Sequence, residues 1–151
     1  MNVAVYPGSF DPFTRGHEEI VRKALPLFDK IHVAVGVNTD KRCLFSEEKR
    51  INWIKKCFVD EPKVEVCTYE GLTIDLCKKL GVRTMIRGLR NIMDFQYEQD
   101  VAIANSKLCS EINTIFFLSS PELAHVSSSM VRELYRYHAD CSSYVSYNLF
   151  E

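Results

Sequence analysis

The sequence predicts one α/β domain built around a mostly parallel sheet. Short, β-branched apolar runs alternate with longer amphipathic runs along the 151 residues, and brief breakers separate them. No internal repeat, low-complexity tract or shift in composition divides the chain. Five strand and helix units in succession are typical of a doubly wound, Rossmann-like fold. We therefore expect a single domain over residues 1–151 with a five-stranded, mostly parallel sheet.

The expected strands are apolar through consecutive positions, as strands covered on both faces are. They occupy residues 2–6, 31–37, 64–68, 83–87 and 113–118. The helices expected after them occupy residues 17–28, 47–58, 72–80, 93–108 and 130–138.

Local signals indicate where several helices begin and end. Ser46 is the expected N-cap of the second helix, and Gly81 the expected stop of the third. Pro26 is expected to end or kink the first helix, because an interior proline costs about 3 kcal/mol. The fourth helix carries one apolar stripe at helical spacing: Tyr97, Val101, Ala104 and Leu108.

Composition and charge indicate which partners and which cellular compartment to expect. With 19 basic and 20 acidic residues the net charge is -1, which argues against nucleic acid or an anionic membrane as a partner. The chain shows no signal-peptide pattern and no apolar stretch of roughly 18 residues, so we expect a cytoplasmic protein. Six cysteines without a CxxC pair are expected to be reduced packing residues.

The loop after the first strand, PGSFDPFTRGH at residues 7–17, concentrates unusual residues. Gly8 and Gly16 allow tight backbone turns, and Ser9 offers a hydroxyl. His17 falls in the first turn of a helix, where the helix dipole favours a negative group. The run matches neither GxGxxG nor the P-loop. Since ligands of such sheets bind beyond the carboxyl ends of the strands, we expect this loop to hold phosphate.

Two later loops supply more polar groups to the same edge. IRGLRNIMDFQYEQD, at residues 86–100, brings Arg87, Gly88 and Arg90, while Glu98 could accept bonds from a ligand or pair with an arginine. HVSSSMVRELY, at residues 125–135, places three serines at a helix N-terminus, where they either bind a polyphosphate or simply cap the helix. Lys41 adds a further cation after the second strand, although a lone lysine is more often a surface residue.

These three motifs together resemble a known family. PGSFDPFTRGH is similar to the nucleotidyltransferase signature that ends in a (His or Thr)-x-Gly-His element. That motif alone is shared with nicotinate-nucleotide adenylyltransferases and cytidylyltransferases. RGLRN followed by DFxYE, together with HVSSSMV, narrows the resemblance to bacterial phosphopantetheine adenylyltransferases.

The resemblance implies transfer of the adenylyl group of ATP to 4'-phosphopantetheine, giving dephospho-coenzyme A and pyrophosphate in coenzyme A biosynthesis. It implies Mg2+ carried by ATP, no metal ligand from the protein, and a homohexamer. It assigns catalysis to His17, Lys41, Arg90 and Ser128. It assigns phosphopantetheine to Ser9, Lys41, Thr73 and Arg87. It assigns ATP to Ser9, Phe10, His17, Gly88, Leu89, Arg90, Glu98, Leu123, Ala124, His125, Val126, Ser127, Ser128 and Ser129.

The residue types suit direct displacement at phosphorus. A phosphate monoester is largely dianionic at neutral pH and needs no general base to attack. It needs in-line positioning and cations that offset the repulsion between two anions. Two other functions stay open: adenylyl or cytidylyl transfer to another phosphate acceptor such as nicotinate mononucleotide, and a non-catalytic nucleotide-binding module.

Two features depart from the family pattern. Asp100 stands where relatives commonly carry glutamine, which makes the fourth helix more acidic. After Ser143 the chain lacks the proline that often opens a last helix, so the packing of its C-terminal residues is not predicted.

Overall fold

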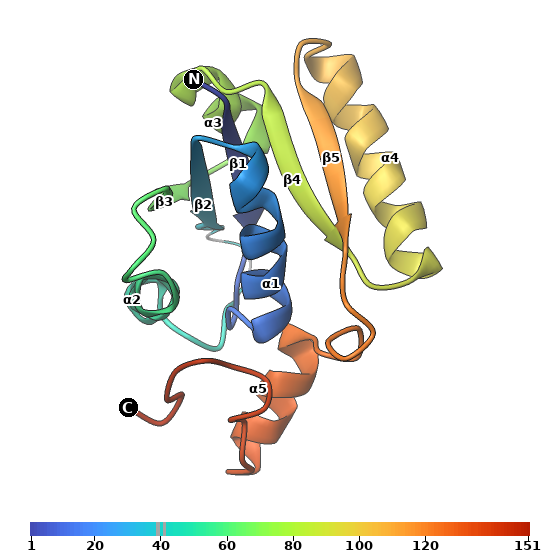
Figure 1. Cartoon of the computed structure of the whole chain (residues 1–151). Coiled ribbons are helices and arrows are strands. Elements are labelled where there is room, and N and C mark those ends of the chain that lie inside the picture. Colours follow the sequence, from blue (N-terminus) through green and yellow to red (C-terminus); the bar gives the residue numbers. More distant parts are fainter. Residues whose placement is uncertain (39, 41) are drawn as a thin grey trace.

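Five parallel strands form one sheet in the computed structural model, which describes residues 1–38, 40 and 42–151 (Figure 1). Their order across the sheet is β3-β2-β1-β4-β5. The strands are β1 (Val3–Gly8), β2 (Lys30–Gly36), β3 (Val64–Tyr69), β4 (Thr84–Leu89) and β5 (Asn113–Leu118). The predicted fold class and all five predicted strands are confirmed.

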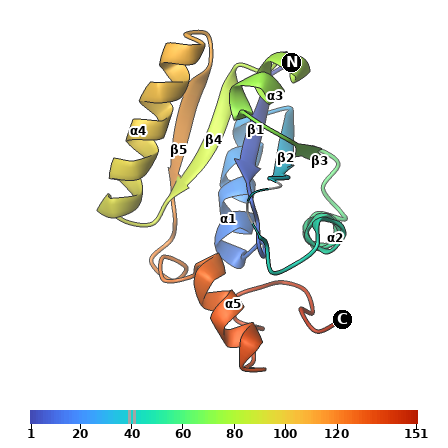
Figure 2. The same ribbon diagram turned by 180° about the vertical axis from the view of Figure 1, so that it is seen from behind.

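Helices cover both faces of this sheet. They are α1 (Arg15–Ala24), α2 (Glu47–Cys57), α3 (Thr73–Leu80), α4 (Ile92–Leu108) and α5 (Ser128–Arg136), with a short 3-10 turn η1 (Leu25–Leu27) after α1. Side chains of α1 and α2 pack with Tyr6, Val33 and Ile86 on one face. Those of α3 pack with Val5 and Ala34 on the other, which Figure 2 shows from behind. The helix α5 lies beyond the carboxyl ends of the strands (Figure 1).

The sheet has its topological switch point between β1 and β4. These strands pair where Ala4 faces Thr84 and Val5 faces Met85, whereas β1 and β2 pair along the whole of β1. Beyond Val5 and Met85 the ladder between β1 and β4 ends. Because ligands of open α/β sheets bind at such a point, the fold places a crevice at the carboxyl ends of these two strands.

The predicted bounds of α2, α3 and α4 are correct to within one residue, whereas α5 begins and ends two residues earlier than predicted. Ser46 accepts a hydrogen bond from the Lys49 amide at 3.2 Å and caps α2, and Gly81 ends α3 with φ 66°. Pro26 falls in η1, so α1 ends at Ala24. The first helix begins two residues earlier than predicted, because Thr14 is its cap.

The apolar stripe of α4 is largely exposed. Tyr97 is 68% exposed and Leu108 is 59% exposed. The buried position is instead Glu98, which pairs with Arg87 on β4. Apolar residues also face the sheet: Val101 and Ala102 line a cavity with Met85 of β4, and Phe95 packs on Phe116 of β5 with ring centroids 6.2 Å apart.

The strand β4 ends two residues later than predicted and contains Gly88 and Leu89. A Cβ on Gly88 would lie 2.9 Å from Cγ1 of Ile20 on α1. The glycine therefore allows close packing of α1 on the strand, which is a structural reason beyond the expected approach of a ligand.

The C-terminal residues 137–151 form turns that pack on α2 and α5. Tyr147 stacks on Trp53 with ring centroids 5.0 Å apart, and Val145 and Leu149 are buried beside them. The six cysteines are all free, as expected. Among the described residues, no helix has the length and apolar character needed to span a membrane.

Candidate active site

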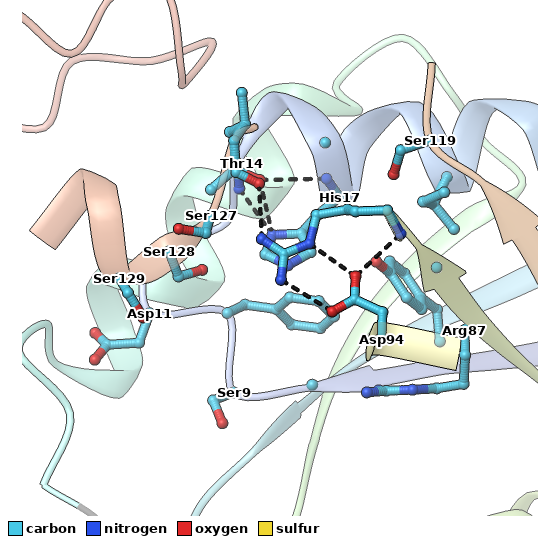
Figure 3. Close-up of a pocket in the computed structure, with 18 of the residues that line it drawn as sticks. Ser9, Asp11, Thr14, His17, Arg87, Asp94, Ser119, Ser127, Ser128 and Ser129 are labelled. Carbon is cyan, nitrogen blue, oxygen red and sulfur yellow. Dashed lines mark hydrogen bonds and ion pairs between the residues drawn. The ribbon is translucent and has the colours of Figure 1, made fainter. Parts of the chain in front are cut away.

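A cavity of about 370 Å3 lies at the switch point (Figure 3). Its walls come from the end of β1 and the turn after it, the first turns of α1 and α5, the end of β4 and the start of α4. Residues from all three sequence motifs thus meet at one site, although they are separated by up to about 120 positions in the chain.

His17 is fixed in this cavity by the N-terminus of its own helix. The Thr14 amide donates to Nδ1 of His17 at 3.0 Å, and the Thr14 hydroxyl accepts from the His17 amide at 3.3 Å. This is a reciprocal capping box. Because a backbone amide can only donate, Nδ1 is the acceptor, and a neutral ring carries its proton on Nε2.

The surroundings of His17 keep its imidazole uncharged. Burial, together with the smaller effects of the nearby guanidinium groups of Arg87 and Arg90, lowers the pKa of His17 to about 3. The rings of Phe10 and Phe13 lie 5.1 and 5.4 Å from the imidazole, which accounts for the desolvation. At neutral pH the group can donate one hydrogen bond from Nε2 without adding charge.

The turn that precedes His17 depends on a second glycine contact. Phe10 has φ 49°, and its buried ring would be 2.7 Å from a Cβ on Gly8. Gly8 is therefore needed for the ring of Phe10 to pack over the strand end. Gly16, predicted to form a turn, instead lies inside the first turn of α1 and lines the cavity.

Arg87 and Glu98 form a two-point ion pair across the crevice. Nε and Nη2 of Arg87 donate to the Glu98 carboxylate at 2.8 and 2.6 Å, and Nη1 donates to the Pro7 carbonyl at 2.6 Å. Glu98 is 7% exposed. Of the two interpretations left open for Glu98, the structure has the pairing with arginine.

Arg90 spans the mouth of the cavity. Its Nε and Nη2 donate to the Asp94 carboxylate at 2.9 and 3.2 Å, and its Nη1 donates to the Val126 carbonyl at 3.3 Å. The side chain thereby links the start of α4 to the segment before α5.

The three serines at the start of α5 all line the cavity, on the side opposite Arg87 (Figure 3). Ser127 is the N-cap and accepts from the Met130 amide at 3.1 Å. Ser128 donates to the Pro12 carbonyl at 2.8 Å. Ser129 accepts from Arg132 at 3.2 Å. Ser127 alone is the helix cap, so capping does not explain the presence of Ser128 and Ser129 in the lining of the cavity.

A second cavity of about 120 Å3 lies on the α4 side of the sheet. Thr73 lines it, together with Tyr97 and Asn105 of α4. Pro7, Arg87 and Glu98 line both cavities, so the ion pair and the end of β1 to which it bonds form the wall that the two share. The predicted site is therefore divided between two adjoining spaces.

The structure brings most, but not all, of the predicted residues to these cavities. The first cavity is lined by Ser9, Phe10, His17, Arg87, Gly88, Arg90, Glu98, Val126, Ser127, Ser128 and Ser129. Four predicted ATP contacts lie outside its lining: Leu89, Leu123, Ala124 and His125. Lys41 falls outside the described residues. Asp100 is on the exposed part of α4 and lines neither cavity.

Sequence reasoning missed several polar residues of the site, namely Asp11, Thr14, Asp94 and Arg132. Thr14 and Asp11 lie inside the first motif, PGSFDPFTRGH, where the sequence predicts only a turn for them. Arg132 lies four residues after Ser128, one helical turn away, so the helical period could have placed it on the cavity side.

The C-terminal residues support the turn that carries His17. The Arg15 amide donates to the Tyr144 carbonyl at 2.7 Å, and the Tyr147 hydroxyl donates to the Phe13 carbonyl. The Ser146 hydroxyl donates to Glu18 of α1 at 2.6 Å. The end of the chain thus fixes the backbone on either side of Thr14.

Comparisons with known proteins agree with this geometry. A family model described as cytidylyltransferase-like matches residues 5–134. A bifunctional NMN adenylyltransferase/ADP ribose pyrophosphatase from Francisella tularensis has the same fold, with a TM-score of 0.76 at 15% identity, over 97% of this chain and 45% of that one. The family model and the fold together are those of a nucleotidyltransferase.

Curated relatives place the chain more narrowly. It is 51% identical to the phosphopantetheine adenylyltransferase of Flavobacterium psychrophilum, over 94% of this chain and 93% of the relative. It is 46% identical to that of Leptospira biflexa, over 95% and 90% respectively. The chain therefore belongs to the phosphopantetheine adenylyltransferase family.

Proposed function

We propose that this protein transfers the adenylyl group of ATP to 4'-phosphopantetheine and releases pyrophosphate and dephospho-coenzyme A. The observation that carries the proposal is the pair of cavities that meet at Arg87 and Glu98. The first offers hydrogen-bond donors and helix N-termini suited to a triphosphate. The second is a narrower space that suits the pantetheine arm.

In this proposal ATP occupies the first cavity. The N-termini of α1 and α5 both open on it and favour the negative phosphates. Nε2 of His17 donates to an oxygen of the α-phosphate as charge develops there. Because the imidazole is already neutral and held by Thr14, the donor needs no reorganisation during the reaction.

The acceptor phosphate attacks without a general base. An oxygen of phosphopantetheine forms a bond to the α-phosphorus while the bond from that phosphorus to the bridging oxygen breaks, and the electron pair leaves with pyrophosphate. Arg87 lies where the two cavities meet, and Nη1 and Nη2 each carry a second N–H group that can donate to the phosphates there, beside the bonds to Pro7 and Glu98. Thr73 and Lys41 are the further predicted contacts of the acceptor.

Mg2+ enters this reaction as part of the substrate MgATP. The carboxylates that line the first cavity already have partners: Asp11 accepts from the amides of Leu44 and Phe45, Asp94 pairs with Arg90, and Glu98 pairs with Arg87. Such a site fits an ion held mainly by phosphate oxygens and water, which is the usual state of Mg2+ with nucleotides. The ion would neutralise part of the phosphate charge.

We further propose that the protein works in the cytoplasm as a homohexamer. Exposed apolar side chains of α4 and β5 support assembly, because monomers rarely leave so many on one part of their surface. The set consists of Ile92, Met93, Phe95, Tyr97, Ile103, Leu108, Ile115 and Leu118, which are 37% to 83% exposed.

The proposed reaction is tested by pyrophosphate release with a panel of substrates. We expect release with ATP and 4'-phosphopantetheine, and background rates with CTP or with nicotinate mononucleotide or glycerol phosphate as acceptor. Turnover of nicotinate mononucleotide alone would show that the acceptor is wrong. ATP binding without turnover of any acceptor would instead indicate a non-catalytic nucleotide-binding module.

A further inference from the structure

Asp11 and Arg50 are buried charged side chains that the proposed reaction does not use. Asp11 lies in the turn after β1 and is 5% exposed, and Arg50 lies on α2 and is 4% exposed. Burying a charge is costly unless hydrogen bonds satisfy it. Both side chains meet this condition by bonding to the backbone of the same residue, Phe45, which precedes α2.

Arg50 bonds to carbonyl oxygens of three separate segments. Its Nε donates to the Phe45 carbonyl at 3.2 Å, and its Nη1 donates to the carbonyls of Ser9 at 2.7 Å and Gly36 at 3.4 Å. No carboxylate of residues 1–38, 40 and 42–151 forms an ion pair with this guanidinium. Arg50 therefore joins the turn after β1, the end of β2 and the residue before the cap of α2.

Asp11 strengthens the same connection from the other partner. Its carboxylate accepts hydrogen bonds from the amides of Leu44 at 2.8 Å and Phe45 at 2.9 Å. Phe45 is thus held at its amide by Asp11 and at its carbonyl by Arg50. Gly36 and Phe45, which flank the segment between β2 and α2, are both fixed to the turn after β1.

This segment forms part of the wall of a third cavity, of about 500 Å3. Val37 and Cys43 of the segment line it together with Ser9 and Tyr69. Ser9 also lines the first cavity, and Tyr69 also lines the second, so the third cavity adjoins both. The bonds of Arg50 therefore fix a wall beside the place where the two substrates are proposed to meet.

We propose that Arg50 is a positioning residue for the acceptor in the adenylyl transfer. The inference rests on the proposed function and concerns a side chain that lines neither the first nor the second cavity. In-line attack requires the acceptor phosphate to be held at a fixed place relative to the α-phosphorus, and an error of about 1 Å can cost about 100-fold in rate. Arg50 meets this requirement through Ser9 and the segment that follows β2.

The test compares the wild-type protein with Arg50→Gln and Arg50→Lys. Glutamine carries no charge and reaches fewer carbonyls, whereas lysine keeps the charge but lacks the planar fork that binds several carbonyls at once. Lys49→Gln is the matched control, because Lys49 is the neighbouring residue of α2, is exposed, and loses the same charge. Circular dichroism gives the folded fraction, and steady-state pyrophosphate release gives kcat and the KM of each substrate.

We expect Arg50→Gln to lower kcat about tenfold or more, the size expected when hydrogen bonds from a charged group are lost. The KM of phosphopantetheine should rise, while the KM of MgATP stays within about twofold. The reason for this difference is that the first cavity is lined largely by α1, β4, α4 and α5, and the hydrogen bonds of Arg50 among the described residues go elsewhere.

The conservative variant and the control separate positioning from folding. Arg50→Lys should recover part of the lost kcat, and Lys49→Gln should match wild type. A wild-type KM of phosphopantetheine in Arg50→Gln, or an equal rise in both KM values, would overturn the proposal. A lower kcat that only follows the folded fraction would overturn it as well.

Hydrogen exchange of the wild-type protein provides a test that needs no variant. The amides of Leu44 and Phe45, which donate to Asp11, report on the end of the segment that Arg50 holds. We expect saturating 4'-phosphopantetheine to slow their exchange more than saturating MgATP does, and an equal effect or none would contradict the assignment. Failure of the adenylyl transfer itself would appear separately, as an absence of dephospho-coenzyme A from the wild-type reaction.

Discussion

The chemistry of His17 depends on its neighbours more than on its place in the motif. The Thr14 amide determines which ring nitrogen carries the proton, and the aromatic rings of Phe10 and Phe13 keep the ring uncharged. The sequence predicted that His17 faces an anion from its position at a helix start. It could not predict a neutral donor, because that depends on packing between side chains.

The neutral state of His17 has a testable pH dependence. Its pKa falls from 6.5 to about 3 on folding, so the ring stays neutral between pH 5 and 8, while the unfolded chain takes up a proton below about pH 6.5. The contribution of this group to stability is therefore full above pH 6.5 and is lost as the pH falls toward 3.

Nitrogen-15 NMR of the imidazole measures both predictions for His17. We expect signals of the Nε2-protonated tautomer that do not titrate between pH 5 and 8. A His17 midpoint near 6.5, or a proton on Nδ1, would refute this description of the donor.

Among the elements, α4 shows where pattern analysis fails. Its sequence carries an apolar stripe, but the buried residue of the helix is Glu98, while Tyr97 and Leu108 of the stripe are exposed. A hydrophobic stripe identifies the apolar face but not what covers it. Here the ion pair with Arg87 decides which face turns inward.

If the exposed apolar residues of α4 form contacts between subunits, a charge placed among them should weaken the assembly. Met93 is 81% exposed, so Met93→Glu should weaken contacts between subunits, while an acidic residue in the first turn suits the helix itself. Sedimentation velocity should show a six-chain species for wild type and smaller species for Met93→Glu.

Val59→Glu is the control for this assembly experiment. Val59 is 80% exposed but follows α2, away from α4 and β5. The six-chain species should persist in this variant. A wild-type protein that sediments as a single 17.4 kDa chain, or an unchanged assembly of Met93→Glu, would count against the proposed surface.

The packing of the C-terminal residues could not be predicted from the sequence, because the proline that often opens a last helix in the family is missing after Ser143. In the structure they form turns that bond to the backbone at Phe13 and Arg15. Such contacts join residues more than 120 positions apart, and no local pattern in the sequence indicates them.

At the scale of the whole molecule, the strand order produces the site. The ladder between β1 and β4 stops at Val5 and Met85, so the ends of these strands leave room for ligands. The alternation of strands and helices was enough to predict the sheet and the edge at which the motifs would meet. The division into two cavities was not predictable, because it arises from the ion pair of Arg87 with Glu98.

Because the site is divided in this way, residues predicted to act in one reaction line different cavities. Thr73 lines the second cavity and His17 the first, although both were assigned to one reaction. The family resemblance assigns His17 to ATP and Thr73 to phosphopantetheine. For these two residues to serve one reaction, the two substrates must meet at Arg87, which lines both cavities.

A crystal structure with dephospho-coenzyme A tests this claim most directly, because that product contains both the adenylyl group and the pantetheine arm. We predict that its adenylyl phosphate lies within hydrogen-bond distance of Nε2 of His17. The pantetheine arm should pass Arg87 and enter the cavity lined by Thr73 and Asn105. A product bound with its arm outside that cavity, or with its phosphates away from His17, would contradict it.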